Sequence, residues 1–295
     1  MNPVSMQVLL IGVMAIWGVN ISAVKVLTTQ LDPLLVACLR MVLAVAVINL
    51  TLFLARQPLK LRGITRKQWL RFLLCALLMV YGNQVLFTAG MRSASATNAA
   101  LISALSPLMA SLLVAAMFRE TLTRRRLVGI VIGFGGVAAV VLNRSGAAVE
   151  GAGWGDLQVF SALLSFVSGG VLIQSMAKQF GALVISGIIY TIGTVILCVH
   201  LAFSEIAGQI PGMAFPGWWL VMLLLFSGVV ATAIGNMVWN RALIEIGAAR
   251  SAMYQYWIPV FGVLFAILLL DEPFSAWHAV GLVAILLGTY LGTRR

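Results

Sequence analysis

The sequence contains little charge, little acid and almost no cysteine or histidine. Of its 295 residues 9% are charged, whereas 62% are hydrophobic, and the mean hydropathy is +1.06. So few charges cannot cover the surface of a soluble domain of this size. The composition therefore excludes a soluble globular protein and indicates an all-α membrane protein that crosses the bilayer many times.

Cysteines and histidines are too few and too scattered to suggest covalent or metal chemistry. Cys38, Cys75 and Cys198 lie far apart within apolar segments and indicate neither a disulfide framework nor a metal site. His200 and His278 lie near the ends of predicted helices without HExxH-type spacing, which is typical of interfacial residues. The sequence has no Ser/His/Asp set and no Gly-rich phosphate loop, so an enzyme is disfavoured and no cofactor is expected.

Ten apolar segments are long enough to cross about 30 Å of hydrocarbon as helices, which takes roughly 17–25 residues each. These predicted spans are 6–26, 33–54, 69–91, 95–118, 127–143, 156–177, 182–203, 217–239, 249–270 and 276–292. The sequence thus predicts ten transmembrane helices.

The second half of the chain repeats the first at an offset of 152 residues. Matching pairs include Pro107 and Pro259, Leu112 and Leu264, Glu120 and Glu272, Gly129 and Gly281, and Gly136 and Gly288. Five spans per half is an odd number, so the second half enters the membrane from the opposite side. We therefore predict two inverted five-helix repeats, 1–148 and 149–295, an arrangement typical of secondary transporters.

The loop charges predict the orientation. With a cytoplasmic N-terminus, most Lys and Arg residues fall in inside loops, among them Arg66, Arg124, Arg125, Arg126 and Arg241. The positive-inside rule then puts both termini in the cytoplasm, and these loops would lie against anionic lipid head groups. The basic residues are spread over short loops with no binding module, which disfavours a nucleic-acid partner.

The paired prolines predict two bends. A proline inside a helix lacks the N–H that would bond to the carbonyl four residues earlier, so Pro107 and Pro259 would free the carbonyls of Ser103 and Gln255. A tolerated transmembrane proline is the alternative. Recurrence in both repeats favours matched hinges beside a cavity.

Polar side chains recur at helical spacing in two spans. Gln84 and Thr88 lie four residues apart, Tyr81 extends that face, and Asn236 and Asn240 occupy the same positions in the second repeat. Such faces are costly toward lipid, so they must face protein or water. They either form interhelical hydrogen bonds or line a central cavity.

Aromatic and amide residues also occur together inside predicted spans. Tyr254, Gln255 and Trp257 precede Pro259, and Trp17 and Asn20 lie three apart in the first span. Aromatic faces beside neutral amides suit a small amphipathic solute better than a hydrated ion, although core packing is an alternative. We expect the first, third, fourth, eighth and ninth helices to form a substrate site that includes these residues, Ser103 and the polar faces above.

Arg40 lies seven residues beyond Pro33, roughly 10 Å into the membrane by helical rise. An unpaired guanidinium is costly there, so it must pair, reach the interface or contact water. We favour a structural pairing, with binding of a substrate carboxylate as the alternative.

Glycine pairs and capping residues predict structural roles. Gly129 with Gly133, and Gly288 with Gly292, are GxxxG pairs that allow close helix contact, either within the fold or in a dimer, which leaves monomer and homodimer open. Thr123 and Ser275, also 152 apart, stand where helix N-caps are expected. Glu120 and Glu272 precede them, and we expect both to tie helix ends and loops.

Several motifs resemble one known family. The stretch AIWGVNISAVK, the DP…LR pattern, FRETL, LDEPF, VGIVIGFGG and VGLVAILLG resemble the EamA-type exporters of the drug/metabolite transporter superfamily. The chain is most similar to the bacterial aromatic amino acid exporter type. This resemblance, which covers essentially the whole chain, implies a ten-helix exporter in the cell inner membrane.

The sequence therefore predicts a carrier that exports small metabolites, with amino acids as the expected substrates, by alternating access. Because no Asp or Glu lies deep within a predicted span, facilitated diffusion is the simplest mechanism. The alternatives are an exporter of cationic drugs or other metabolites, a channel, and a membrane-embedded enzyme.

Overall fold

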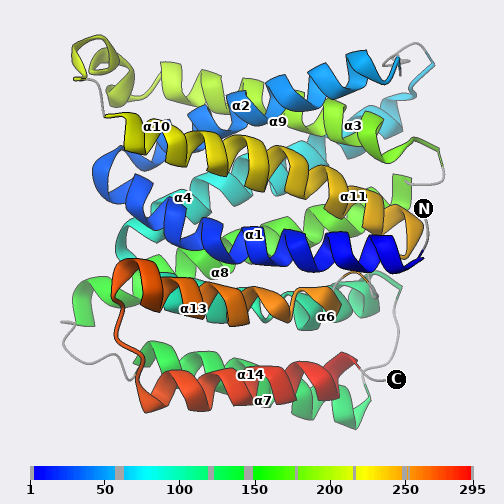
Figure 1. Ribbon diagram of the computed structural model, residues 1–295. Coiled ribbons are helices and arrows are strands. Elements are labelled where there is room, and N and C mark those ends of the chain that lie inside the picture. Colours follow the sequence, from blue (N-terminus) through cyan, green and yellow to red (C-terminus); the bar gives the residue numbers. More distant parts are fainter. Residues whose placement is uncertain are drawn as a thin grey trace.

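The computed structural model describes residues 3–56, 63–118, 123–142, 149–176, 179–214, 217–247, 251 and 253–293. Within these residues every regular element is a helix. The helices lie side by side in one bundle, and the N- and C-terminal ends lie at the same end of it (Figure 1).

The helices of the two halves of the chain follow one another in this order. The first half contains α1 (Pro3–Gln30), α2 (Pro33–Leu54), α3 (Arg66–Cys75), η1 (Ala76–Gly82), α4 (Asn83–Ser93), α5 (Ala96–Ser103), α6 (Ser106–Phe118) and α7 (Arg124–Leu142). The second contains α8 (Val149–Met176), α9 (Ala182–Ala202), η2 (Glu205–Gly208), η3 (Ile210–Gly212), α10 (Trp218–Leu225), η4 (Phe226–Ile234), α11 (Gly235–Glu245), α13 (Trp257–Leu270) and α14 (Ala276–Thr293). The segments α3, η1 and α4 follow one another without a break, as do α10, η4 and α11.

Helix length and composition agree with a multi-pass membrane protein. Among the described residues, seven helical stretches are long and apolar enough to cross a membrane. Three further apolar helices are shorter within the described residues: Leu127–Ala139, Trp257–Leu270 and Ala276–Gly288. Large apolar side chains such as Phe53, Leu54 and Trp218 are exposed, which is the expected state of side chains that face lipid.

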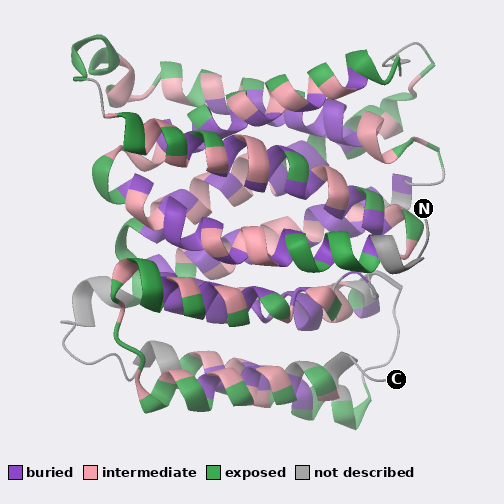
Figure 2. Cartoon of the chain, in the orientation of Figure 1, coloured by how far each residue is buried: buried purple, intermediate pink, exposed green. Residues whose placement is uncertain are grey.

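The bundle is built from helix pairs at its edges and a buried centre. Helices α7 and α14 pack together at one edge, and α2 packs against α9 toward the other (Figure 1). Between them, α1 packs on α13 and α4 packs on α8. Helix α5 (Ala96–Ser103) is buried along nearly its whole length, whereas most described residues of α7 and α14 are exposed or half-buried (Figure 2).

Glycines bring α7 and α14 into close contact. A Cβ atom added to Gly288 would clash with the backbone of Gly129 and Gly133, and one added to Gly136 would clash with Gly281 and Ala284. The close helix approach predicted from Gly129, Gly133 and Gly288 is therefore confirmed, and it lies within one chain.

Two π-helical segments recur in the repeat. Gly82 ends η1, and adding the offset of 152 gives Ile234, which ends η4. A π-helical turn widens the helix and changes which side chains share a face. Neither segment was predicted from the sequence.

The paired prolines differ from the expected bends. Each follows a turn that interrupts the helix, at 104–105 and at 255–256. Pro107 and Pro259 therefore lie in the first turns of α6 and α13, where the missing N–H costs no helical hydrogen bond. The carbonyl of Gln255 is also not free, because it accepts the N–H of Ile258 at 3.0 Å.

One end of the bundle is tied by polar contacts. The carboxylate of Glu272 accepts hydrogen bonds from the N–H groups of Ala96 and Thr97, and Lys25 Nζ donates to the carbonyl of Ala94 at 2.6 Å. The predicted tie through Glu272 is confirmed. Its repeat partner Glu120 lies outside the described residues.

Thr123 and Ser275 hold the predicted capping positions. Each directly precedes its helix, and each carbonyl accepts a first-turn hydrogen bond, from Leu127 and Ala279 respectively. The hydroxyl of Ser275 lies 3.0 Å from Nδ1 of His278. His278 therefore takes part in the start of α14.

Candidate substrate pocket

A pocket lies among helices from both halves of the chain. Its cavity volume is about 130 Å3, and the wider space around it, open solvent included, is about 790 Å3. The lining combines aromatic, amide, hydroxyl and aliphatic side chains: Trp17, Asn20, Ile21, Arg40, Met79, Asn83, Gln84, Phe87, Ser103, Ser106, Val159, Leu163, Phe166, Tyr190, Ala231, Thr232, Asn236, Gln255 and Ile258.

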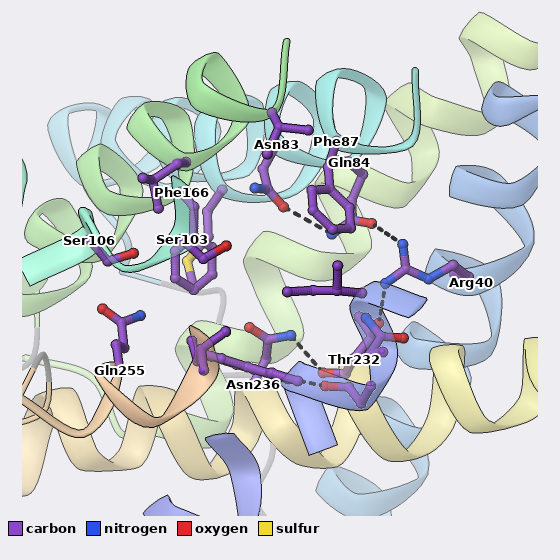
Figure 3. A pocket seen from close by; sticks show the side chains of 18 of the residues that line it. Arg40, Asn83, Gln84, Phe87, Ser103, Ser106, Phe166, Thr232, Asn236 and Gln255 are labelled. Atoms are coloured by element: carbon purple, nitrogen blue, oxygen red, sulfur yellow. Dashed lines mark hydrogen bonds between the residues drawn. The ribbon is translucent and has the colours of Figure 1, made fainter. Parts of the chain in front are cut away.

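The structure brings seven of the predicted site residues together in this lining. They are Trp17, Asn20, Arg40, Gln84, Ser103, Asn236 and Gln255. Three of the lining residues lie at helix interruptions. Ser103 and Ser106 flank the turn at 104–105 between α5 and α6, and Gln255 lies in the turn at 255–256 that precedes α13 (Figure 3). Helix α2 lines the pocket through Arg40, and α8 and α9 also line it, which the sequence did not predict.

Among the described residues that line the pocket, Arg40 is the only Asp, Glu, Lys or Arg. Its side chain is 2% exposed, and its guanidinium donates to Gln84 Oε1 at 2.9 Å and to Thr232 Oγ1 at 3.2 Å. Both partners are neutral. A charged residue at a helix centre in the bilayer costs about 2.5–3.5 kcal/mol on insertion scales. Because both partners are neutral, their hydrogen bonds do not neutralise the charge of Arg40. The predicted pairing is thus a hydrogen-bonded one.

Amide side chains fix the orientation of Gln84. Its Nε2 donates to Asn83 Oδ1 at 3.0 Å, and Asn83 Nδ2 in turn donates to the carbonyl of Ala162 at 3.0 Å. Since a carbonyl can only accept, this chain of donors leaves Gln84 Oε1 directed to Arg40. The arginine end of the pocket is therefore held in place from α4 and α8.

A second chain of hydrogen bonds runs along η4 to α1. The Thr232 hydroxyl donates to the carbonyl of Ser227 at 2.7 Å, and the Ser227 hydroxyl donates to Asn20 Oδ1 at 2.6 Å. Asn236 Nδ2 donates to the carbonyl of Thr232 at 2.8 Å. These contacts orient the polar groups of α1 and of the second half.

Trp17 joins an aromatic cluster with Phe166 and Trp239. Its ring centroid lies 5.9 Å from that of Phe166 and 5.6 Å from that of Trp239, within the usual range for favourable ring pairs. The indole N–H donates to the carbonyl of Ala231 at 2.9 Å. In η4 the N–H of Gly235 bonds to Val230 and Thr232 instead of Ala231, and this π-helical pattern leaves room for the Trp17 contact.

Five predicted residues lie outside the lining of this pocket. Tyr81 belongs to η1, whose wider turn separates it from the face of Gln84, and its hydroxyl lies 3.2 Å from Nδ1 of His200. Thr88 donates to the Gln84 carbonyl of its own helix.

Asn240 forms an interhelical hydrogen bond, since its Nδ2 donates to the hydroxyl of Ser186 at 2.8 Å. Tyr254 packs against the hydrophobic core. Trp257 is 45% exposed and stacks near Phe261, with 5.9 Å between ring centroids. For Asn240, the interhelical alternative considered for these polar faces is the one observed.

Two pairs of side chains become neighbours only in the fold. The sulfur atoms of Cys38 and Cys198, for which the sequence indicated no disulfide framework, lie 3.4 Å apart between α2 and α9, and both thiols are free. Asp156 is 3% exposed and accepts hydrogen bonds from Asn98 Nδ2 at 3.3 Å. It lies near the start of the predicted sixth span, so the expectation of no deeply placed carboxylate still holds for it.

Sequence reasoning missed several pocket residues. Thr232 lies one helical turn before Asn236, and Ser106 directly precedes Pro107, so helical spacing could have indicated both. Phe166 and Tyr190 lie in long apolar runs without any distinguishing pattern. Only their packing identifies them.

A bundle of apolar membrane-length helices around a mixed aromatic and polar pocket is the architecture of a membrane transporter. The comparison with known proteins specifies the family. The chain matches the EamA-like transporter family twice, over residues 4–142 and 153–294. It belongs to the EamA-like transporter family.

Known relatives cover nearly the whole chain. "Uncharacterized transporter YyaM" of Bacillus subtilis is 23% identical over 290 residues, covering 98% of this chain and 93% of the relative. "Probable amino-acid metabolite efflux pump" of Escherichia coli is 25% identical over 298 residues, covering 96% and 93%. A solved structure titled "Crystal structure of protein" matches with a TM-score of 0.68 at 17% identity, over 97% of this chain and 96% of that one. This structural match supports the fold alone.

Proposed function

We propose that this transporter exports small metabolites, with neutral amino acids, aromatic ones included, as its substrates. The observation that carries the proposal is the pocket, which is lined by the polar side chains of Arg40, Gln84 and Asn236 and by the aromatic ring of Trp17. Such a lining offers polar groups for the amino and carboxylate groups of an amino acid and an apolar wall for its side chain. A relative named as a probable amino-acid metabolite efflux pump, 25% identical, adds support.

We also propose ten transmembrane helices in two inverted repeats. The double family match and the recurrence of π-helical segments and helix interruptions within one or two residues of the repeat offset support this arrangement. So do the helix pairs α2 with α9 and α7 with α14, because each joins equivalent elements of the two halves. In such a carrier the halves exchange conformations and expose the pocket to each side in turn, with the interruptions before Pro107 and Pro259 as hinges.

The loop charges support an inner-membrane protein with both termini in the cytoplasm. Cysteine labelling tests this orientation. A cysteine introduced near Arg124 should be shielded from an impermeant thiol reagent added to intact cells, whereas one at Ser275 should react. The opposite pattern would contradict the proposed orientation, and equal labelling of the two cysteines would contradict the inverted arrangement.

Reconstitution tests the transport function itself. Purified protein in liposomes should move at least one neutral amino acid with saturable kinetics and should leave cationic drugs behind. Trp17→Ala should weaken the flux of an aromatic substrate while its abundance in the membrane stays near normal. Flux of cationic drugs alone, or flux that rises linearly with concentration, would contradict the proposal.

A further inference from the structure

The guanidinium of Arg40 has hydrogen-bond donors to spare. It carries five N–H groups, and its hydrogen bonds within the described residues are the two to Gln84 and Thr232, one from each terminal nitrogen. Each terminal nitrogen therefore keeps one N–H. Donors on the two terminal nitrogens can bind the two oxygens of a carboxylate.

Asn236 provides an acceptor with no partner among the described residues. Its Oδ1 is buried and unbonded, while its Nδ2 is held by the Thr232 carbonyl. Because that carbonyl can only accept, the nitrogen must lie on its side and the oxygen must point the other way. Figure 3 shows this oxygen turned from Thr232 toward the part of the pocket that Gln255 and Ser103 line.

Thr232 connects the two groups. Its hydroxyl accepts from Arg40, and its carbonyl accepts from Asn236, four residues later in the chain. The donors of Arg40 and the unfilled acceptor of Asn236 are thus linked through one residue, and both side chains line one pocket. An α-amino acid carries the complementary groups, a carboxylate acceptor and an ammonium donor, on a single carbon.

We propose that the pocket binds an amino acid in one orientation, with its carboxylate on Arg40 and its ammonium group on Asn236 Oδ1. This inference rests on the proposed function and specifies its substrate class. The aromatic faces of Trp17 and Phe166 then face the side chain of the substrate. The carboxylate is the essential group, since it supplies the charge that the lining lacks.

Charge selectivity follows from this orientation. An amine without a carboxylate meets the positive charge of Arg40, and the described lining contains no Asp or Glu to offset the repulsion. A carboxylate without an amine keeps the main contact and leaves Asn236 Oδ1 unbonded. The pocket therefore ranks the full amino acid first, the simple carboxylate second and the amine last.

Three ligands with one phenyl group and different head groups test the proposal in purified protein. They are phenylalanine, 3-phenylpropionate and phenethylamine, with binding followed by calorimetry or thermal stabilisation. Wild type should bind phenylalanine about tenfold more tightly than 3-phenylpropionate, the factor that one hydrogen bond of about 1.4 kcal/mol supplies. Phenethylamine should not bind measurably.

Two substitutions separate the roles. Asn236→Ala should weaken phenylalanine binding about tenfold and leave 3-phenylpropionate binding unchanged. Arg40→Gln should abolish the binding of both carboxylates, and Arg40→Lys, which keeps the charge, should restore part of it. This restoration would not occur if Arg40 were needed only for packing.

Equal binding of all three ligands, binding of none of them, or an equal loss of phenylalanine and 3-phenylpropionate in Asn236→Ala would overturn the proposed orientation. These measurements need no transport. Selective carboxylate binding without flux in liposomes would therefore contradict the proposed function while the binding orientation stands. Flux of amino acids without carboxylate selectivity would contradict the binding orientation while the proposed function stands.

Discussion

The carboxylate of Glu272 caps a helix of the other half of the chain through Thr97. It accepts the backbone N–H of Thr97 at 2.9 Å and the Thr97 hydroxyl at 2.7 Å, and its other oxygen accepts the N–H of Ala96 at 2.7 Å. Helix α5 begins at Ala96, so a negative charge lies at the positive end of a helix that leads to the pocket.

Removing this charge should loosen that end of the bundle. Glu272→Gln keeps the size of the side chain but loses hydrogen bonds to a charged group, which contribute about 1.5–3 kcal/mol each. We expect a lower thermal unfolding temperature and faster reaction of a cysteine at position 103 with reagents from that end. Glu245→Gln is the matched control, because Glu245 pairs with Arg241 at the surface and exposed pairs contribute little. An equal effect of both substitutions would contradict the role of Glu272.

Close packing between α7 and α14 makes Gly288 intolerant of a side chain. The added Cβ of Gly288→Ala would meet backbone atoms of Gly129 and Gly133, which cannot rotate away. Overpacking of this kind typically costs about 1–3 kcal/mol, so the unfolding temperature should fall. Gly12→Ala is the control, since open space surrounds that position. Equal unfolding temperatures for the two variants would show that the two helices are not closely packed.

Cys38 and Cys198 offer a reversible link between the two halves. Their sulfur atoms are 3.4 Å apart, and a small approach brings them to the length of about 2.05 Å of a disulfide. An added oxidant that accepts the two electrons, such as copper phenanthroline, should form the bond and slow transport, and a reductant should restore it. Cys75→Ser should react like wild type, whereas Cys38→Ser should be insensitive. Full transport by the cross-linked protein would mean that α2 and α9 do not move apart.

The prolines should act on opposite sides of the membrane. Replacing Pro107 or Pro259 with Ala allows the preceding turn to continue as helix, which biases the carrier toward one facing state. Because the repeats are proposed to be inverted, the two substitutions should shift the accessibility of a cysteine at 103 or 255 in opposite directions. Shifts in the same direction would reduce both prolines to structural residues.

Hydropathy and the repeat predicted the helical fold well, because a span must be apolar along its whole length whatever its neighbours are. Local features were less predictable. The face assigned to Tyr81 and Gln84 assumed a regular α-helix, and the π-helical segment η1 separates them. Asn240 and Trp257 are of the same residue types as Asn236 and Trp17. Asn240 nevertheless bonds to Ser186 of another helix, and Trp257 is exposed. Helix rotation and packing decide such cases, and a single sequence does not specify them.

Arg40 shows the same difference between what the sequence predicts and what helix packing decides. Helical rise predicted its depth, and the cost of burial predicted that it needs partners. Its partners Gln84 and Thr232 lie 44 and 192 residues away in the chain. Gln84 was predicted as a residue of the site but not as a partner of Arg40, and Thr232 was not predicted, although its spacing of four residues from Asn236 could have indicated it. Which side chains meet across helices is decided only when the helices pack.

Counterflow in proteoliposomes tests the central claim most directly, namely that one pocket between the two halves carries an amino acid across the membrane by alternating access. Vesicles are loaded with an excess of the unlabelled amino acid that binds most tightly, and the labelled form is added outside at trace concentration. The account predicts that the label accumulates transiently inside above its outside concentration, and that Arg40→Gln abolishes this accumulation. Equilibration without any overshoot in wild-type vesicles, at a rate that does not saturate, would contradict it.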